Sequence, residues 1–136
     1  MFVVDASVAL AWVFDDEAST SADPILDRLE HETAVAPAHW PLEVANALRT
    51  AERRGRLTGP DLQRLAALLA ALPVEIAPVE LSTALHSVLE IAREQGLTAY
   101  DAAYLGLAMV REIPVATIDS ELRDACRRAG VALLVE

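Results

Sequence analysis

The chain has 136 residues, is 54% hydrophobic and carries a formal net charge of −10. This length and apolar content exclude a disordered chain and predict one domain over residues 1–136. The longest apolar run, Leu65 to Leu72, is much shorter than the roughly 20 residues of a membrane span, so no membrane association is expected.

Two further features bear on where the protein works. The start, Met1 to Asp5, carries a carboxylate where a secretion signal carries positive charge. Cys126 is the one cysteine and permits no internal disulfide, which fits a reducing compartment. We therefore expect a cytoplasmic protein.

Short β-branched runs alternate along the chain with longer helical patterns. In chain order we expect a strand at 2–4, helices at 6–14 and 18–31, a strand at 33–36, helices at 41–54 and 57–72, a strand at 74–77, helices at 81–95 and 98–112, a strand at 115–117, a helix at 120–128 and a strand at 131–135. Pro41 suits a helix start, and Gly55 and Gly96 suit helix ends. The alternation predicts an α/β fold, with a mostly parallel sheet of about five strands and helices on both faces.

Four acidic residues stand where such a fold binds ligands, outside the carboxyl ends of its strands. Asp5 directly follows the first strand, and Asp119 follows the strand at 115–117. Glu43 and Asp101 lie in the first turns of two predicted helices. Carboxylates crowded together repel one another unless cations lie between them, and hard oxygen ligands suit Mg²⁺ or Mn²⁺.

Each acid also has a purely structural interpretation. Asp5 could cap the helix that follows, and Asp119 could do the same in competition with Ser120. Thr98 and Asp101 resemble a capping box with Asp in place of Glu. Glu43 would be favourable in any first helical turn because of the helix dipole.

Four strings of residues surround these acids. They are Val3-Val4-Asp5-Ala6-Ser7, Glu43-Val44-Ala45-Asn46, Leu97-Thr98-Ala99-Tyr100-Asp101-Ala102-Ala103-Tyr104 and Ala116-Thr117-Ile118-Asp119-Ser120-Glu121-Leu122. In this order the strings resemble the PIN-domain family, and within it the VapC-type toxins of bacterial toxin–antitoxin pairs. The resemblance covers essentially the whole chain and implies a three-layer PIN-like sandwich.

The resemblance implies that Asp5, Glu43, Asp101 and Asp119 form a metal site for Mg²⁺, with Mn²⁺ as a substitute. Asp119 matches the most variable of these positions, and Asp124 lies nearby. The resemblance also gives supporting positions to Ser7, Asn46 and Thr117, which we expect to orient carboxylates and water. The implied activity is an endoribonuclease that hydrolyses RNA phosphodiester bonds with water activated by metal.

Two other metal-dependent phosphoryl enzymes fit poorly. A haloacid-dehalogenase phosphatase needs a second Asp two residues after Asp5, where this chain has Ser7. A receiver domain relies on a lysine, and all 11 basic side chains here are arginine. The remaining alternative is a catalytically degenerate PIN fold that serves as a protein-binding module.

The resemblance further implies a small antitoxin partner and a homodimer. Aromatic residues near the chain start, Trp12 and Phe14, are candidates for such a surface. Arg54 lies within about 20° of Glu43 on a helical wheel and is the candidate for RNA contact. His31, His39 and His86 lack metal-ligand spacing and are expected in surface or packing roles.

Overall fold

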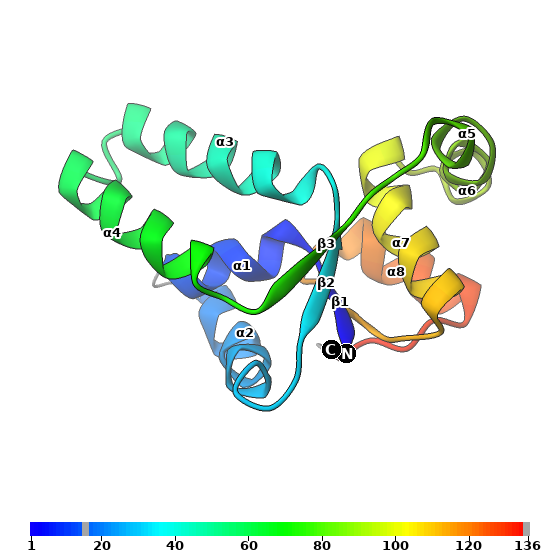
Figure 1. Cartoon of the computed structure of the whole chain (residues 1–136), viewed down its shortest axis with the longest axis horizontal. Helices are drawn as coiled ribbons and strands as arrows, with labels where there is room; N and C mark the ends of the chain where they lie inside the picture. Colours follow the sequence, from blue (N-terminus) through cyan, green and yellow to red (C-terminus); the bar gives the residue numbers. More distant parts are fainter. Residues whose placement is uncertain (15–16, 135–136) are drawn as a thin grey trace.

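A computed structural model describes residues 1–14 and 17–134. Its elements are β1 (Phe2–Val4), α1 (Ala6–Val13), α2 (Glu17–Arg28), β2 (Ala34–Pro37), α3 (Trp40–Arg53), α4 (Gly59–Ala70), β3 (Val74–Ala77), α5 (Leu81–Thr83), the π-helical segment η1 (Ala84–Val88), α6 (Leu89–Gln95), α7 (Ala99–Arg111), β4 (Val115–Ala116) and α8 (Ser120–Ala129). Helices α1 to α4 lie on one side of the strands and α5 to α8 on the other (Figure 1). The predicted α/β class is confirmed.

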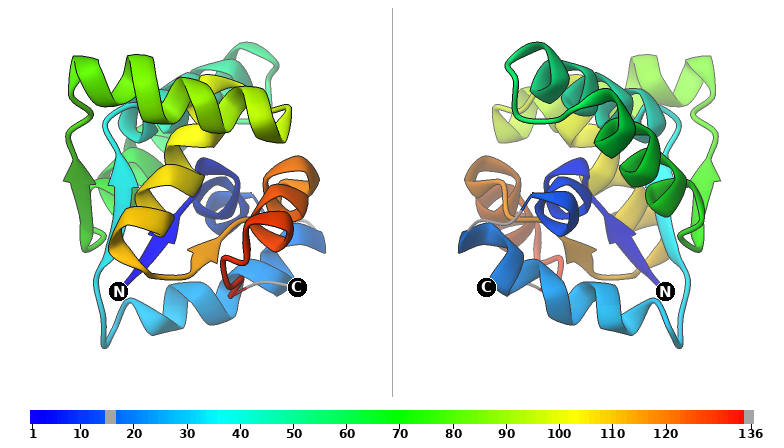
Figure 2. Two further views of the ribbon diagram at one scale, coloured as in Figure 1. Left: turned by 90° about the vertical axis from the view of Figure 1, so that its right-hand side faces the viewer. Right: turned by 90° about the vertical axis from the view of Figure 1, so that its left-hand side faces the viewer.

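The sheet has the strand order β3-β2-β1-β4, and every neighbouring pair is parallel. The arrows therefore run in the same general direction, fanned out by the twist of the sheet (Figure 2). In the register, Val3 pairs with Val35 on one side and with Val115 on the other. Strand β1 is central, so the residue that follows it emerges in the middle of the sheet edge.

The predicted strand at 131–135 is not a full strand in the described part of the chain. Leu133 forms one isolated parallel bridge to Val115. Its neighbours add two backbone hydrogen bonds, from the N–H of Val115 to Ala132 and from the N–H of Leu134 to the carbonyl of Val115. Strand β4 is only two residues long, so it cannot pair with a longer strand. The described sheet therefore has four strands and one isolated bridge, where about five strands were expected.

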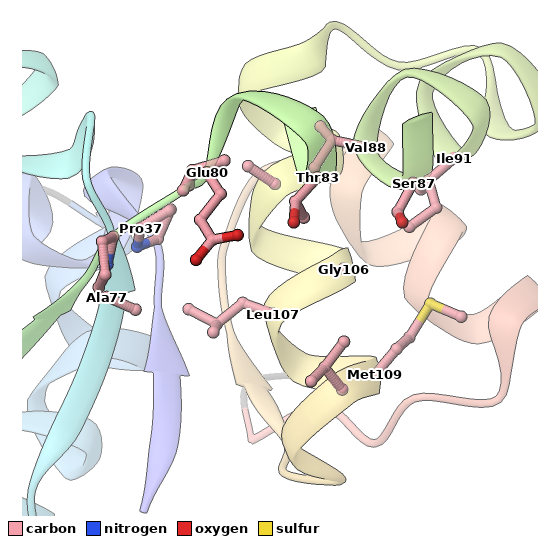
Figure 3. A pocket seen from close by; sticks show the side chains of 14 residues that line it. Pro37, Ala77, Glu80, Thr83, Ser87, Val88, Ile91, Gly106, Leu107 and Met109 are labelled. Carbon is pink, nitrogen blue, oxygen red and sulfur yellow. The ribbon is translucent and has the colours of Figure 1, made fainter. Parts of the chain in front are cut away.

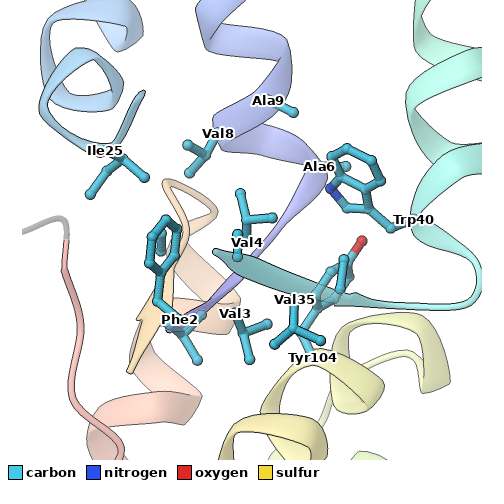
Figure 4. Packing of buried hydrophobic residues seen from close by; sticks show 14 of the residues in the cluster. Phe2, Val3, Val4, Ala6, Val8, Ala9, Ile25, Val35, Trp40 and Tyr104 are labelled. Atoms are coloured by element: carbon cyan, nitrogen blue, oxygen red, sulfur yellow. The ribbon is translucent and has the colours of Figure 1, made fainter. Parts of the chain in front are cut away.

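The core lies on both faces of β1. Phe2, Val3 and Val4 are fully buried, and Figure 4 shows them between helical side chains such as Val8 and the ring of Tyr104. Helix α7, which carries Tyr104, packs across β1, β2 and β4. Because β1 is covered on both faces, its sequence is continuously apolar rather than alternating.

The predicted helix at 81–95 is one rod with an irregular centre. It begins as α5, passes through the π turns of η1 and continues as α6, with backbone angles close to helical at the junctions. Gly96 ends it in the left-handed conformation at φ 66°, as predicted from the glycine. Among the described residues, no helix has the length and apolarity needed to cross a membrane.

Candidate active site

The predicted acids meet in one pocket of about 320 Å³ at the carboxyl edge of the sheet. Its lining contains Asp5, Glu43, Asp101 and Asp119, together with Ser7 and Asn46. Strands β1 and β4 are parallel neighbours, so Asp5 and Asp119 leave the sheet at the same edge. Helices α3 and α7 bring Glu43 and Asp101 to that edge in their first turns.

Asp5 occupies the position before α1 but does not cap it through its side chain. Its Oδ2 instead accepts hydrogen bonds from Ser7 Oγ at 2.7 Å and from Thr117 Oγ1 at 2.6 Å. Only 5% of Asp5 is exposed. The interpretation of Asp5 as a simple helix cap is therefore wrong.

The two hydroxyl groups are themselves held by the backbone. Thr117 Oγ1 accepts from the N–H of Asp119 at 3.1 Å, and Ser7 Oγ accepts from the N–H of Ile118 at 3.2 Å. With their lone pairs engaged by these amides, both hydroxyls direct their hydrogens at Asp5. Burial nevertheless raises the pKa of Asp5, against the opposing effect of these hydrogen bonds and with added repulsion from Glu43 and Asp119.

Asp101 lies one turn inside α7, where Thr98 Oγ1 accepts its backbone N–H at 3.2 Å. The cap by Thr98 is thus present, as predicted. Within residues 1–14 and 17–134, the Asp101 carboxylate accepts no hydrogen bond that would complete a capping box. Burial first, and then repulsion by Asp119, Asp5 and Glu43, raises the pKa of Asp101 to about 6.

A second copy of the same local motif shows what the site adds. Thr58 caps α4 and accepts the N–H of Asp61 at 3.3 Å, in the same spacing as Thr98 and Asp101. Hydrogen bonds from Thr58 lower the pKa of Asp61, which faces solvent. The opposite shift of Asp101 therefore comes from its surroundings in the pocket and not from its place in a helix cap.

Glu43 is held by two residues that the sequence interpretation did not assign to the site. Tyr104 Oη donates to Glu43 Oε1 at 2.8 Å, and His39 Nε2 lies 3.0 Å from the same oxygen without the alignment of a hydrogen bond. The His39 ring packs on Tyr104 and Tyr100, with centroids 5.1 and 5.3 Å away. Burial alone would raise the pKa of Glu43, but the contacts with His39 and Tyr104 outweigh it and lower the pKa.

Spacing contained a signal for both residues. His39 lies four positions before Glu43, and Tyr104 lies three positions after Asp101, so each stands one helical turn from an acid. His39 was expected in a surface or packing role, and it does pack on the two tyrosines. Its contact with Glu43 is an i,i+4 pair at the start of α3, whereas the hydrogen bond of Tyr104 joins α7 to α3, which spacing within one helix does not reveal.

Asp119 combines two roles. Its Oδ1 accepts from the N–H groups of Glu121 at 2.8 Å and Leu122 at 3.3 Å, so Asp119 rather than Ser120 caps α8. Its carboxylate nevertheless lines the pocket. The nearby Asp124 is exposed and pairs with Arg127 at 3.2 Å.

The donor chemistry of the pocket fits a hard divalent cation. Four carboxylates share it, the pKa values of Asp5 and Asp101 are raised, and mutual repulsion contributes to both shifts. A cation between them would remove that repulsion. In the described part of the chain, no three acidic, histidine or cysteine side chains are already closed around one point, so a cation would have to draw them together.

Comparison with known proteins agrees with this site. The model of the family described as PIN domain matches residues 2–128. Ribonuclease VapC12 of Mycobacterium tuberculosis is 30% identical over 122 residues, which cover 90% of this chain and 89% of that protein.

Solved structures share the fold. The crystal structure of PAE2754 from Pyrobaculum aerophilum aligns with a TM-score of 0.74 and 25% identity, over 98% of this chain and 83% of that one. A toxin–antitoxin complex from Klebsiella pneumoniae aligns with a TM-score of 0.66 and 17% identity, over 100% and 99% of the two chains. Together with the family match and the VapC12 relative, these alignments show that the chain belongs to the PIN-domain family and is of the VapC type.

Proposed function

We propose that this protein is an endoribonuclease that depends on Mg²⁺ or Mn²⁺ and acts as the toxin of a toxin–antitoxin pair in the cytoplasm. The observation that carries the proposal is the pocket in which Asp5, Glu43, Asp101 and Asp119 meet. The name of the VapC12 relative supports RNA as the substrate, and the toxin–antitoxin complex from Klebsiella pneumoniae supports an antitoxin partner.

The four acids would hold the metal, each prepared differently by the fold. Bound there, the cation would supply positive charge that acidifies a water molecule and offsets the charge on the phosphate. Asp5 is fixed by Ser7 and Thr117 and would be the most rigid ligand. Asp101 accepts no hydrogen bond among the described residues and is the acid freest to turn toward an incoming cation.

The other residues of the pocket would orient rather than react. Tyr104 and His39 contact Oε1 of Glu43, so Oε2 would be available to a cation. Asn46 lies one turn after Glu43 on an exposed part of α3 and can bind water or a phosphate oxygen with its amide. Oδ1 of Asp119 accepts the hydrogen bonds that cap α8, so Oδ2 would be available to bind the cation.

Asp101→Asn tests the activity, with Asp61→Asn as a matched control. Both changes remove one carboxylate from the first turn of a helix with a threonine cap, but only Asp101 lines the pocket. We expect Asp101→Asn to lose RNA cleavage by orders of magnitude, and Asp61→Asn and wild type to cleave with Mg²⁺ or Mn²⁺ and to stop with EDTA. We also expect wild-type expression to arrest growth, and either Asp101→Asn or an adjacent small gene product to relieve it.

The competing function is a metal-free, degenerate PIN fold that binds proteins. Titration calorimetry with Mg²⁺ separates the two, because the nuclease must bind the ion and Asp101→Asn must weaken the binding. Undiminished RNA cleavage by purified Asp101→Asn protein would refute the assignment of the site.

We also propose a homodimer, but not through the residues near the chain start. Trp12 is half-buried, and its indole N–H donates to the carbonyl of Ala22 at 2.8 Å, so this ring serves the packing of α1 on α2. Exposed apolar side chains gather instead around the α5–α6 rod and the end of α7, which we call the α5–α7 face. It comprises Val79, Leu81, Leu85, Leu89, Met109 and Val110.

The α5–α7 face has both a hollow and projecting side chains. The hollow, about 470 Å³, lies between Pro37 and Ala77 on one wall and Val88, Ile91 and Met109 on the other (Figure 3). Leu81 and Val110 project nearby with 76% and 84% of their surfaces exposed. A two-fold axis would place the projecting groups of each copy against the hollow of the other.

Apolar area favours a second copy as the occupant of this face. Its six large side chains, at roughly 100 Å² each, offer about 600 Å² of apolar surface, or about three quarters of the ~800 Å² per partner of a standard interface. Two chains of charge −10 repel each other, and Glu80 also lines the hollow, so apolar contact at this face must outweigh the repulsion between the copies. The acidic pocket stays open in such a dimer, because its lining and that of the hollow share no residue.

A further inference from the structure

We infer that the groove between α1 and α3 is the path of the RNA strand beside the acidic pocket, and that Arg54 and Arg56 bind phosphates a few nucleotides from the cleaved bond. This inference rests on the proposed ribonuclease activity. It adds a second recognition site to the acids, with the backbone of single-stranded RNA as its ligand.

The groove is continuous with the acidic pocket. Leu10 of α1 and Ala47 of α3 line both the acidic pocket and a neighbouring hollow of about 280 Å³. Phe14, Thr50, Arg54 and Arg56 complete that hollow, with Ala51 at its base. A further recess beside it is lined by Thr50, Arg53 and Arg54. A chain bound at the acids therefore has a way onward between α1 and α3.

Helix α3 places the polar groups along this path in one stripe. Glu43, Asn46, Thr50 and Arg54 follow one another at spacings of three or four residues, so they share a helix face. Arg54 lies 11 residues after Glu43, which is about 16 Å along the axis. That distance corresponds to a few nucleotides of an extended strand and is too long for contact with the cleaved phosphate itself.

Arg56 is held ready for an anion. Its guanidinium lies over the ring of Phe14, 4.3 Å from the centroid. Stacking of this kind restricts the side chain but leaves the N–H groups at the guanidinium edge free to bind a phosphate in two places. Phe14 is itself half-buried at the end of α1, so the ring that Arg56 covers is held by packing.

The charge distribution gives the path a direction. Among the described residues, five arginines form ion pairs with acidic side chains, namely Arg28, Arg49, Arg64, Arg111 and Arg127. Arg53, Arg54 and Arg56 lie together at one end of α3, and the four pocket acids lie at the other. In a chain of net charge −10, this is the local field that can hold RNA while the acids and their cation engage one phosphate.

The test compares Arg54→Gln and Arg56→Gln with Arg111→Gln. Arg111→Gln removes the same charge far from the groove and serves as the control. Arg111 lies at the opposite end of α7 from Asp101 and pairs with Glu75. Cleavage of a fluorescent single-stranded oligoribonucleotide of mixed sequence is measured with Mg²⁺ over a series of salt concentrations. The same RNA is then shortened stepwise from each end, and melting curves check that every variant is folded.

We expect Arg54→Gln and Arg56→Gln to raise KM several-fold, with kcat almost unchanged and Arg111→Gln like wild type. The slope of log affinity against log salt should become shallower by about 0.7 for each phosphate that the variant no longer binds. Shortening the RNA from one end should abolish the difference between variant and wild type, because the missing nucleotides are those that the arginines hold.

Three results would overturn the inference. If both variants cleave RNA like Arg111→Gln, the groove does not bind RNA, although the nuclease assignment stands. This holds even if the variants bind a protein partner more weakly than wild type does. If the variants lose the same factor on the shortest cleaved RNA, they act through the acidic pocket and not along the groove. If wild-type protein cleaves no RNA at all, the proposed function fails and the inference fails with it.

Discussion

Asp61 and Asp101 differ in one respect that matters for catalysis. Both follow a threonine cap by three residues, yet the pKa of Asp61 is lowered and that of Asp101 is raised. Asp61 faces solvent and accepts hydrogen bonds from Thr58, whereas Asp101 is desolvated beside three other acids. A carboxylate that is costly to ionise without a cation is one that a cation stabilises on binding.

The raised pKa of Asp101 predicts a specific dependence of stability on pH in the metal-free protein. In the unfolded chain this carboxyl ionises near its ordinary value of 3.8, but in the folded protein it holds its proton up to about 6. As pH rises through this window, the unfolded state releases its proton first, so the folded state loses stability relative to it. We therefore expect the melting temperature of Asp101→Asn minus that of wild type to be small at pH 4 and to grow until just above pH 6.

Thermal melts in EDTA across this pH range measure the effect. The melting temperature of Asp61→Asn should instead lie below that of wild type at neutral pH. The pKa of Asp61 is lowered, so its ionised carboxylate stabilises the folded state above that pKa. Added Mg²⁺ should raise the melting temperature of wild type more than that of Asp101→Asn, through its binding to the folded state. A constant difference between Asp101→Asn and wild type from pH 4 to pH 7 would contradict the crowding of these acids.

At the scale of helices and strands, the spacing of apolar residues and the glycines at helix ends predicted most of the fold. Strand β3 lies at the predicted residues, and Gly55, Gly96 and Gly130 end helices with positive φ. Two elements differ from expectation for tertiary reasons. The chain after Val131 pairs at one bridge because β4 ends after two residues, and the rod at 81–95 contains π turns that no apolar spacing distinguishes from an α-helix.

The site was predictable only in part for the same reason. Asp5 and Asp119 follow parallel neighbouring strands, so strand ends alone place them together. Glu43 and Asp101 required the family resemblance, because a first-turn acid is equally expected in a helix without function. The contact of His39 with Glu43 follows from i,i+4 spacing in α3, whereas the hydrogen bond from Tyr104 to Glu43 joins α7 to α3, which sequence spacing does not contain.

Strand β4 contributes to the site through the residue that follows it. Thr117 is fully buried, and its hydroxyl donates to Asp5 while accepting the N–H of Asp119. Thr117→Val keeps the shape but removes both bonds. We expect it to lower the free energy of unfolding by about 1–3 kcal/mol, since it leaves a buried carboxylate and an amide without this partner.

Thr117→Ser is the control, because it retains the hydroxyl and removes only a methyl group. Urea denaturation at neutral pH measures both variants, and RNA cleavage should fall further in Thr117→Val than in Thr117→Ser. Equal stability and activity of the two variants would show that the hydroxyl does not hold Asp5.

The whole molecule separates its functions by charge. Acids converge on the pocket, arginines collect at the end of α3, and the α5–α7 face is mainly apolar. In the proposed dimer, association at the α5–α7 face and RNA binding along α1 and α3 would therefore use different sides of the fold. An antitoxin would be drawn to the acidic pocket by cationic side chains, in competition with the metal and RNA.

The last prediction concerns that apolar face. Leu85→Asp and Val110→Asp each place a charge among exposed apolar side chains, 57% and 84% exposed, so they should cost the monomer little stability. In a dimer the same carboxylates would be buried and close to their symmetry mates, which opposes association by desolvation and repulsion. We expect wild type to have the mass of a dimer by light scattering at micromolar concentration, and both variants to have the mass of a monomer. Leu68→Asp, 56% exposed on α4 at the opposite side of the molecule, should remain a dimer (Figure 1). A monomeric wild type would remove the dimer altogether, whereas dissociation by Leu68→Asp alone would move the interface from the α5–α7 face to α4.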